Sequence, residues 1–416
     1  MKKASLLLKG IQHDGRATNI LVSDGRFSAI GCPADTPADE VMDCTRLAIL
    51  PAFYNAHTHA AMTLLRGYAD DMELFKWLTQ YIWPYEGKLT SEDIRQGSML
   101  AVLEMVKSGT VAFNDMYWNA EQTIDVVQRL GVRATIGLTF MDRLPSEEIE
   151  RLFRFIENWS DPTGGRIPLA VAPHAIYTVS RDLFVRCADA ARAAGVPLHF
   201  HLSETEQEVR DCVAAHGVTP VRLLHQWGVL GSNCVAAHVV HVDDEEISIL
   251  ADADVTVAHC PCSNMKLSSG IFRAEAMAAA GVRVALGTDG CSSNNNLSML
   301  EEAKFASLLA KAHFGPEALP VQRVQQWATR HGAEALGINA GTIAEGVCAD
   351  AILVNLDNER LLPCHNLSSN WIYSADTRSI HSVLCDGRFV LRNGKMEGED
   401  DIIADFKRHI AAKSQK

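Results

Sequence analysis

The middle of the chain repeats one pattern, in which a short apolar run rich in β-branched residues is usually followed by a stretch with helical spacing. Runs without polar alternation are typical of strands buried on both faces, and such strands alternating with helices form a parallel sheet. Eight repeats over roughly 290 residues predict an α/β fold, a (β/α)8 TIM barrel, better than an open doubly wound sheet. The predicted strands are Ala48–Asn55, Thr110–Asp115, Ala134–Thr139, Leu169–Pro173, Pro197–Leu202, Cys234–Val239, Val255–His259 and Arg283–Gly287.

Start signals support the intervening helices. Thr90-Ser91-Glu92-Asp93 precedes the helical pattern of 94–108, and Ser180-Arg181-Asp182 precedes that of 183–194. A glycine follows each pattern, as expected at a helix C-terminus.

Both ends of the chain have a different pattern, with short apolar alternations separated by tight turns. Asp14-Gly15 and Asp24-Gly25 lie near the start, and Asp386-Gly387 and Asn393-Gly394 lie near the end. These dipeptides are hairpin signals. We expect residues 1–50 and 340–416 to form one small β-sandwich domain around a barrel at 51–339. Two unrelated appendages are the alternative.

Composition narrows the classes of partner. The chain has 416 residues, a formal charge of −13 and 47% hydrophobic residues. The acidic balance argues against nucleic acid or an anionic membrane as a partner, and no apolar run reaches the roughly 18 residues of a membrane span. The eleven cysteines lack disulfide-like spacing, which favours a reducing, cytoplasmic location. No glycine-rich phosphate or dinucleotide motif opens a helix.

Candidate chemistry gathers where predicted strands end. In a parallel barrel these carboxyl ends share one rim, which carries the active site. The polar residues there are His57 and His59 after the first strand, His174 after the fourth, His201 and Glu204 at the fifth, His238 at the sixth and Asp289 after the eighth.

The types of these side chains point to a catalytic metal. His57 and His59 are two residues apart, so both imidazoles can reach one ion. Three histidines and a carboxylate, completed by His201 and Asp289, leave room for a water, which is the open arrangement of catalytic zinc. Zinc lowers the pKa of such a water to about 7. Isolated core histidines are the alternative, but it requires four independent polar intrusions at one rim.

Other histidines have a structural interpretation. His199 shares a face with His201 but lies one layer deeper, so we expect it to be a core residue. His241 and His259 are expected to be structural or to lie behind the site.

Four long motifs carry a resemblance to a known family. The segments "HTHAAMTLLRG", "HLSETEQE", "AHCPCSNMKLSSGI" and "GTDGCSSNNNLSMLEE" resemble the amidohydrolase superfamily, within it the S-adenosylhomocysteine/5′-methylthioadenosine deaminase branch. "LAILPAFYNAHTH" and "GTIAEGVCADAILVNL" resemble the family's passages between barrel and β-sandwich. The resemblance covers nearly the whole chain.

The resemblance implies roles for the candidate residues. His57, His59, His201 and Asp289 would bind one divalent metal per chain, zinc first, with iron or manganese as alternatives. Glu204 would shuttle protons, His238 would hold the attacking water, and Asp289 would accept its proton. Glu86 would bind ribose hydroxyls and His174 the purine, so the implied substrate is a purine nucleoside deaminated at its 6-amino group.

One departure bears on the substrate. Users of S-adenosylhomocysteine are expected to place arginines against its carboxylate, and here only Arg133 and Arg143 are candidates, at spacings that do not match. This favours 5′-methylthioadenosine and adenosine.

Alternatives stay open at this point. The same residues suit a deaminase or dechlorinase of guanine, an oxidised purine, a pterin or a triazine. A binuclear hydrolase would need a lysine at the end of the fourth strand, where the chain has "VAPHAIYT". A non-catalytic barrel scaffold would be expected to lose ligands. We also expect a homo-oligomer.

Overall fold

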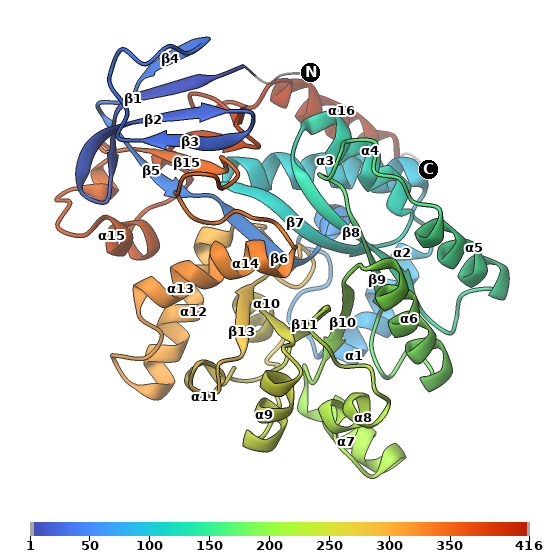
Figure 1. Ribbon diagram of the computed structural model, residues 1–416. Coiled ribbons are helices and arrows are strands. Elements are labelled where there is room, and N and C mark those ends of the chain that lie inside the picture. The colour runs from blue at the N-terminus through green and yellow to red at the C-terminus, as the bar shows by residue number, and fades with distance from the viewer. Residues whose placement is uncertain (1–3, 414–416) are drawn as a thin grey trace.

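The computed structural model describes residues 4–413 and contains two sheets (Figure 1). The larger is a curled parallel sheet in the order β13-β12-β11-β10-β9-β8-β7-β6-β14. Its strands are β6 (Phe53–His59), β7 (Thr110–Tyr117), β8 (Arg133–Phe140), β9 (Leu169–Pro173), β10 (Leu198–Leu202), β11 (Cys234–His238), β12 (Thr256–His259), β13 (Arg283–Leu286) and β14 (Asp289–Gly290).

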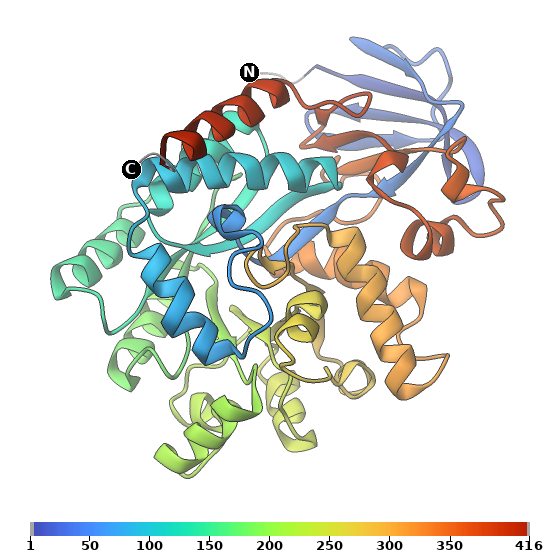
Figure 2. The ribbon, with the colours of Figure 1, turned by 180° about the vertical axis from the view of Figure 1, so that it is seen from behind.

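Helices cover the outside of this curl, as predicted from the alternating pattern (Figures 1 and 2). The α-helices that connect or follow its strands are α3 (Ser91–Lys107), α4 (Ala120–Leu130), α5 (Ser146–Glu157), α6 (Arg181–Ala194), α7 (Glu206–His216), α8 (Pro220–Gln226), α9 (Asp244–Asp252), α10 (Pro261–Lys266), α11 (Ala274–Ala279), α12 (Met299–Phe314), α13 (Val321–Ala328) and α14 (Arg330–Ala335). The expected capping box is present at α3, where Thr90 and Asp93 bond reciprocally.

The first and last strands of the curl meet. β14 follows β13 after two residues and pairs in parallel with β6, Asp289 against Thr58 and Gly290 against His59. Asn55 reinforces the junction because its amide oxygen accepts from the Thr288 amide at 3.0 Å and its amide nitrogen donates to the Thr288 hydroxyl at 2.7 Å.

The second sheet takes strands from both ends of the chain. Its order is β17-β16-β15-β5-β1-β2-β3, with β4 paired to β1. The strands are β1 (Leu6–His13), β2 (Arg16–Ser23), β3 (Arg26–Ile30), β4 (Glu40–Asp43), β5 (Leu47–Pro51), β15 (Ala351–Asn355), β16 (Ile380–Cys385) and β17 (Arg388–Leu391). The joint sheet is thus as expected, and its blue and orange-red strands lie side by side in Figure 1.

One predicted strand is wrong. The run 48–55 is split into β5 and β6, which belong to different sheets and are separated only by Ala52. His57 and His59 accordingly lie within β6 rather than after it. Both halves are buried, so the apolar pattern has no feature that marks the change of sheet.

The remaining elements lie outside the two sheets. A short 3-10 helix at Ala60–Leu65 follows β6, and the helical segment α1 (Leu74–Trp77), Leu78–Ile82 and α2 (Trp83–Glu86) precedes α3. Helix α15 (Leu367–Tyr373) precedes β16. The last helix, α16 (Glu399–Lys413), runs along α3 in both views (Figures 1 and 2), and His409 contacts Asp93 at 2.6 Å. Within residues 4–413 no helix combines the length and apolar character needed to cross a membrane.

Candidate metal centre and catalytic pocket

The sequence-predicted residues meet at the carboxyl ends of the curled strands. A cavity opens there. His57 lies beneath it and the other seven candidates line it, namely His59, Glu86, His174, His201, Glu204, His238 and Asp289.

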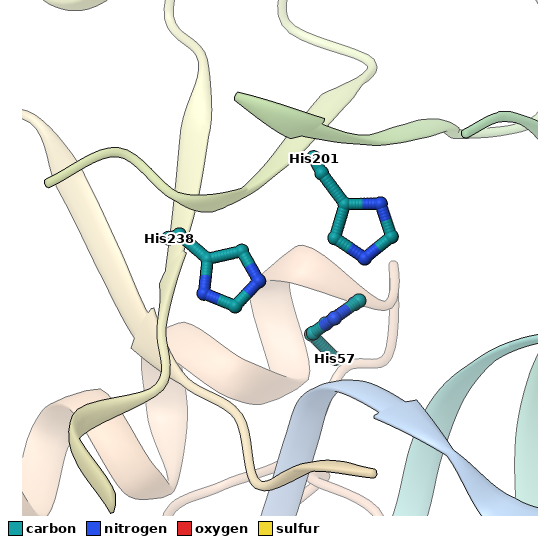
Figure 3. A group of neighbouring side chains, drawn as sticks. All are labelled: His57, His201 and His238. Atoms are coloured by element: carbon teal, nitrogen blue, oxygen red, sulfur yellow. The ribbon is translucent and has the colours of Figure 1, made fainter. Parts of the chain in front are cut away.

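Two overlapping groups of side chains could hold a metal ion. His57 belongs to both, once with His59 and Asp289 and once with His201 and His238. Figure 3 shows the rings of His57, His201 and His238 turned toward a common space. These rings project from β6, β10 and β11. β10 and β11 pair in parallel, with Leu202 opposite His238.

Distances within the group are short. Oδ1 of Asp289 lies 3.3 Å from Nε2 of His57 and 3.2 Å from Nε2 of His59. Nε2 of His59 lies 3.4 Å from Nε2 of His201. Several lone-pair nitrogens and one carboxylate oxygen therefore face the same point.

The buried atoms fit a metal ion. Nε2 of His57 is fully buried and makes no hydrogen bond in the described structure, although it points at the centre. Burial holds the pKa of His57 well below its ordinary value and lowers that of His201 to about 3, so both imidazoles are neutral, the form that binds metal. Burial also opposes charge on His59, but Asp289 outweighs it and raises the His59 pKa to about 9. A cation would displace that proton.

Serine hydroxyls orient Asp289. Its Oδ2 accepts from Ser263 at 2.6 Å and from Ser293 at 2.8 Å, which leaves Oδ1 toward the histidines. Asp289 has a φ of 58°, a left-handed conformation that is uncommon for a non-glycine residue and typical of functional sites.

Glu204 and His238 form the other side of the centre. Oε2 of Glu204 lies 3.8 Å from Nε2 of His238, and its Oε1 accepts from Ser269 at 3.2 Å. Burial raises the pKa of the Glu204 carboxyl, which favours its protonated form. Nδ1 of His238 contacts the amide oxygen of Asn264 at 2.8 Å.

Glu86 and His174 also line the cavity, and the ring centre of His174 lies 4.6 Å from that of His201. Glu86 ends α2, and burial raises the pKa of its carboxyl. His174 follows β9, with Nδ1 2.9 Å from the Thr178 hydroxyl, and burial holds its pKa well below the ordinary value. Apolar walls complete the cavity, including Leu74, Trp77, Trp83 and Trp118.

The two candidate arginines have different positions. Arg133 begins β8, at the end of the strand opposite to the cavity, and pairs with Asp350 and Asp386. Arg143 lies near the cavity, with its guanidinium carbon 5.2 Å from the ring centres of Trp83 and of Trp118. Of the two arginines, only Arg143 therefore lies close to the residues that line the cavity.

Sequence reasoning missed the residues that hold the site in shape. Asn55, Ser263, Asn264 and Glu208 all bond to candidate site residues, either to their side chains or to their backbone. The signal that could have found these residues is that they are polar side chains within or beside apolar segments of the sequence. His199 was interpreted as core; it is buried, but it also contacts His57.

The model of the amidohydrolase family matches residues 48–390. The chain belongs to the amidohydrolase family. Among family members, a 5-methylthioadenosine/S-adenosylhomocysteine deaminase 1 of Archaeoglobus fulgidus is 43% identical over 386 residues, which cover 92% of this chain and 91% of that protein. A 5′-deoxyadenosine deaminase of Methanothermobacter thermautotrophicus is 42% identical, with the same coverage of both chains.

Solved structures place the chain in the same fold. An adenosine deaminase from Xanthomonas campestris, crystallised with zinc, superimposes with a TM-score of 0.90 at 33% identity and covers 97% of each chain. A triazine hydrolase variant reaches a TM-score of 0.89 at 23% identity, covering 98% of this chain and 99% of its own, which is a likeness of fold alone.

Proposed function

We propose that this amidohydrolase is a zinc-dependent deaminase that replaces the 6-amino group of adenosine-type nucleosides by water and releases ammonia. The observation that carries the proposal is that His57 groups with His59 and Asp289 on one side and with His201 on the other, beside the cavity that Glu204 lines. Relatives described as nucleoside deaminases at 42–43% identity support it.

The ligand set is His57, His59, His201 and Asp289, which hold one divalent metal per chain. The clearest sign that these atoms need a cation is Nε2 of His57, which is buried without a hydrogen bond and lies 3.3 Å from a carboxylate oxygen of Asp289. A bound zinc ion supplies Lewis acidity and lowers the pKa of a water to about 7. Iron or manganese suits the same nitrogen and oxygen donors.

Glu204 carries the protons of the reaction. Burial favours its protonated form, so it can deliver a proton to ring nitrogen N1 as water adds at C6. Having given that proton to N1, the same carboxylate takes up the proton of the C6 hydroxyl as ammonia departs, and the proton that Asp289 accepts from the water passes to the leaving amine. His238, 3.8 Å from Glu204, holds the attacking water, and Asp289 accepts its proton.

Glu86 and His174 bind the nucleoside. The Glu86 carboxylate accepts hydrogen bonds from both ribose hydroxyls, and charge-assisted bonds of this kind contribute about 1.5–3 kcal/mol each. His174 contacts the purine, and the tryptophans of the wall pack on its faces. Since Arg133 lies at the far end of β8, 5′-methylthioadenosine and adenosine are the favoured substrates and S-adenosylhomocysteine depends on Arg143 alone.

The proposal includes a closed (β/α)8 barrel at residues 51–339 and a small β-sandwich from 1–50 and 340–416. The pairing of β14 with β6 supports closure, and the sheet shared by both ends supports the second domain. A homo-oligomeric state and a cytoplasmic location remain predictions from the sequence.

A substrate panel tests the proposal. Purified protein is assayed for ammonia release from 5′-methylthioadenosine, adenosine, S-adenosylhomocysteine, adenine, guanine, a pterin and an aminotriazine, and its metal content is measured. We expect conversion of the first two nucleosides and about one zinc per chain. Activity confined to guanine, the pterin or the triazine would reject the nucleoside assignment, and a metal-free, inactive protein would indicate a scaffold.

Glu86→Ala adds a test of the nucleoside orientation. Loss of the ribose contacts should reduce kcat/KM on nucleosides by well over tenfold and hardly affect the slow rate on a free base. Equal losses on both would mean that Glu86 supports the fold instead.

A further inference from the structure

In each imidazole of the centre, the contact made by Nδ1 decides which of the two ring nitrogens carries the proton. Nδ1 of His59 lies 2.6 Å from the Met116 carbonyl oxygen, and Nδ1 of His201 lies 2.8 Å from the His174 carbonyl oxygen. A carbonyl only accepts, so both nitrogens carry the proton and both Nε2 atoms are free for a metal.

His57 lacks such a carbonyl. Its Nδ1 instead lies 2.9 Å from Nε2 of His199, with the two rings nearly perpendicular at 86°. Either nitrogen of this pair could hold the shared proton, so the contact leaves two arrangements open.

Metal binding selects one of them. If Nε2 of His57 binds a cation, its proton must sit on Nδ1, and Nε2 of His199 must accept it. Were His199 the donor, the proton of His57 would occupy Nε2 and block the centre. A protonated His199 would donate from both nitrogens and have the same effect.

The second nitrogen of His199 gives independent support. When Nε2 accepts, the proton lies on Nδ1, which is buried and makes no hydrogen bond in the described structure. An unpaired buried N–H destabilises the fold, so an apolar residue would be more stable at this position. Such exceptions are expected where function requires them.

We propose that His199 is a positioning residue of the metal centre, whose Nε2 accepts the Nδ1 proton of His57 and so directs His57 Nε2 to the metal. The inference rests on the proposed metal centre. It goes beyond that proposal because His199 touches neither metal nor substrate and acts only through His57.

The test compares metal affinity across three variants of the full chain. His199→Leu removes the acceptor, and His199→Gln restores one because its amide oxygen can reach the position of Nε2. His259→Leu is the matched control, since His259 is also a buried strand histidine but stacks on Phe272 at 4.1 Å. Each protein is stripped of metal and titrated with zinc against a chromophoric chelator, and with cobalt for its visible absorption bands.

The expected pattern is specific to positioning. His199→Leu should raise the zinc dissociation constant about 10–100-fold and change the cobalt bands, whereas His199→Gln and His259→Leu should stay within a few-fold of wild type. The metal-free leucine variant should unfold at the same denaturant concentration as wild type or a higher one. If the leucine variant does not fold, His199→Met provides the same comparison.

Two outcomes would overturn the inference: wild-type affinity in the variant without an acceptor, or equal weakening by the leucine and glutamine variants. The proposed function fails separately, because wild-type protein would then bind no metal at all.

Discussion

At Glu204, a single substitution can separate proton transfer from metal binding. Glu204→Gln keeps the shape and the Ser269 contact but cannot carry a proton, so turnover should fall by about 10²–10⁴-fold while bound metal stays at the wild-type level. Steady-state rates and metal analysis measure both. The control is Glu206→Gln, an exposed carboxylate two residues away whose ion pair is with Arg210. Near-normal turnover in the Glu204 variant would remove the proton shuttle from the mechanism.

Glu208 lies behind Glu204 and should make stability depend on pH. Its carboxylate accepts from the amides of Ser203 at 3.0 Å and Glu204 at 2.8 Å, and burial raises its pKa to about 7. The folded chain therefore binds this proton more tightly than the unfolded chain, so its stabilising effect is present below pH 4.5 and is lost as pH rises to about 7.

Comparison with a variant that cannot titrate isolates this effect. Relative to Glu208→Gln, the free energy of unfolding of wild type should fall by about 3 kcal/mol between pH 4.5 and 8, from 2.5 pH units (7 minus 4.5) at about 1.36 kcal/mol each. Urea unfolding of both proteins across that range measures it, and any constant difference cancels. A pH-independent difference would contradict the raised pKa.

At the residue scale, the sequence reveals the candidate metal ligands better than the residues that hold those ligands in place. His57, His59 and Asp289 are visible because each lies in a short segment where chemical type and the end of a predicted strand coincide. Asn264 and Ser263 are not, because their roles depend on loops that meet only in the fold, 26 residues from His238 and Asp289 respectively.

At the scale of elements, the end of β13 lies very close to β6, and Gly287 permits this approach. A Cβ on Gly287 would lie 2.9 Å from both Cβ and the carbonyl oxygen of His57, closer than atoms can pack. Gly287→Ala should push these strands apart, lowering stability by about 1–3 kcal/mol and weakening zinc binding. Urea unfolding and zinc titration measure the two effects. Gly231→Ala is the control, because its nearest contact would be an ordinary 3.4 Å; equal effects would show that the approach to His57 is unimportant.

Helices and strands could be predicted where the hydrophobic period agrees with start and stop signals. They were predicted less well where buried residues continue across a boundary between two strands. Helices α3 and α6 have clear start signals and glycines after their ends, so their bounds were close. The boundary between β5 and β6 was missed because apolar residues continue across Ala52 while the chain changes sheets.

At the scale of the whole molecule, one buried ionic group joins the two sheets. Asp350 precedes β15, is fully buried, and contacts Arg133 of β8 and the Tyr54 hydroxyl of β6 at 3.4 and 2.8 Å. Asp350→Asn leaves Arg133 with less countercharge, so we expect a loss of about 3–5 kcal/mol in the free energy of unfolding. Denaturant unfolding of metal-free protein measures it.

An exposed pair provides the comparison. Asp357 pairs with Arg46 at the surface of the same terminal sheet, and Asp357→Asn should cost less than about 1 kcal/mol. Similar losses in both variants would mean that the buried group does not join the two sheets more strongly than an ordinary surface pair.

The shared sheet has a consequence for how the protein is made. β5 pairs along its length with β15, whose residues are synthesised some 300 positions later, and β5 leads within one residue into the strand that carries His57. During synthesis from the N-terminus, this strand leaves the ribosome long before its partner exists. The emerging chain therefore exposes an apolar, hydrogen-bonding edge until it is nearly complete. A nascent protein of this design depends on slow aggregation, or on a chaperone that shields that edge, before it can assemble its metal centre.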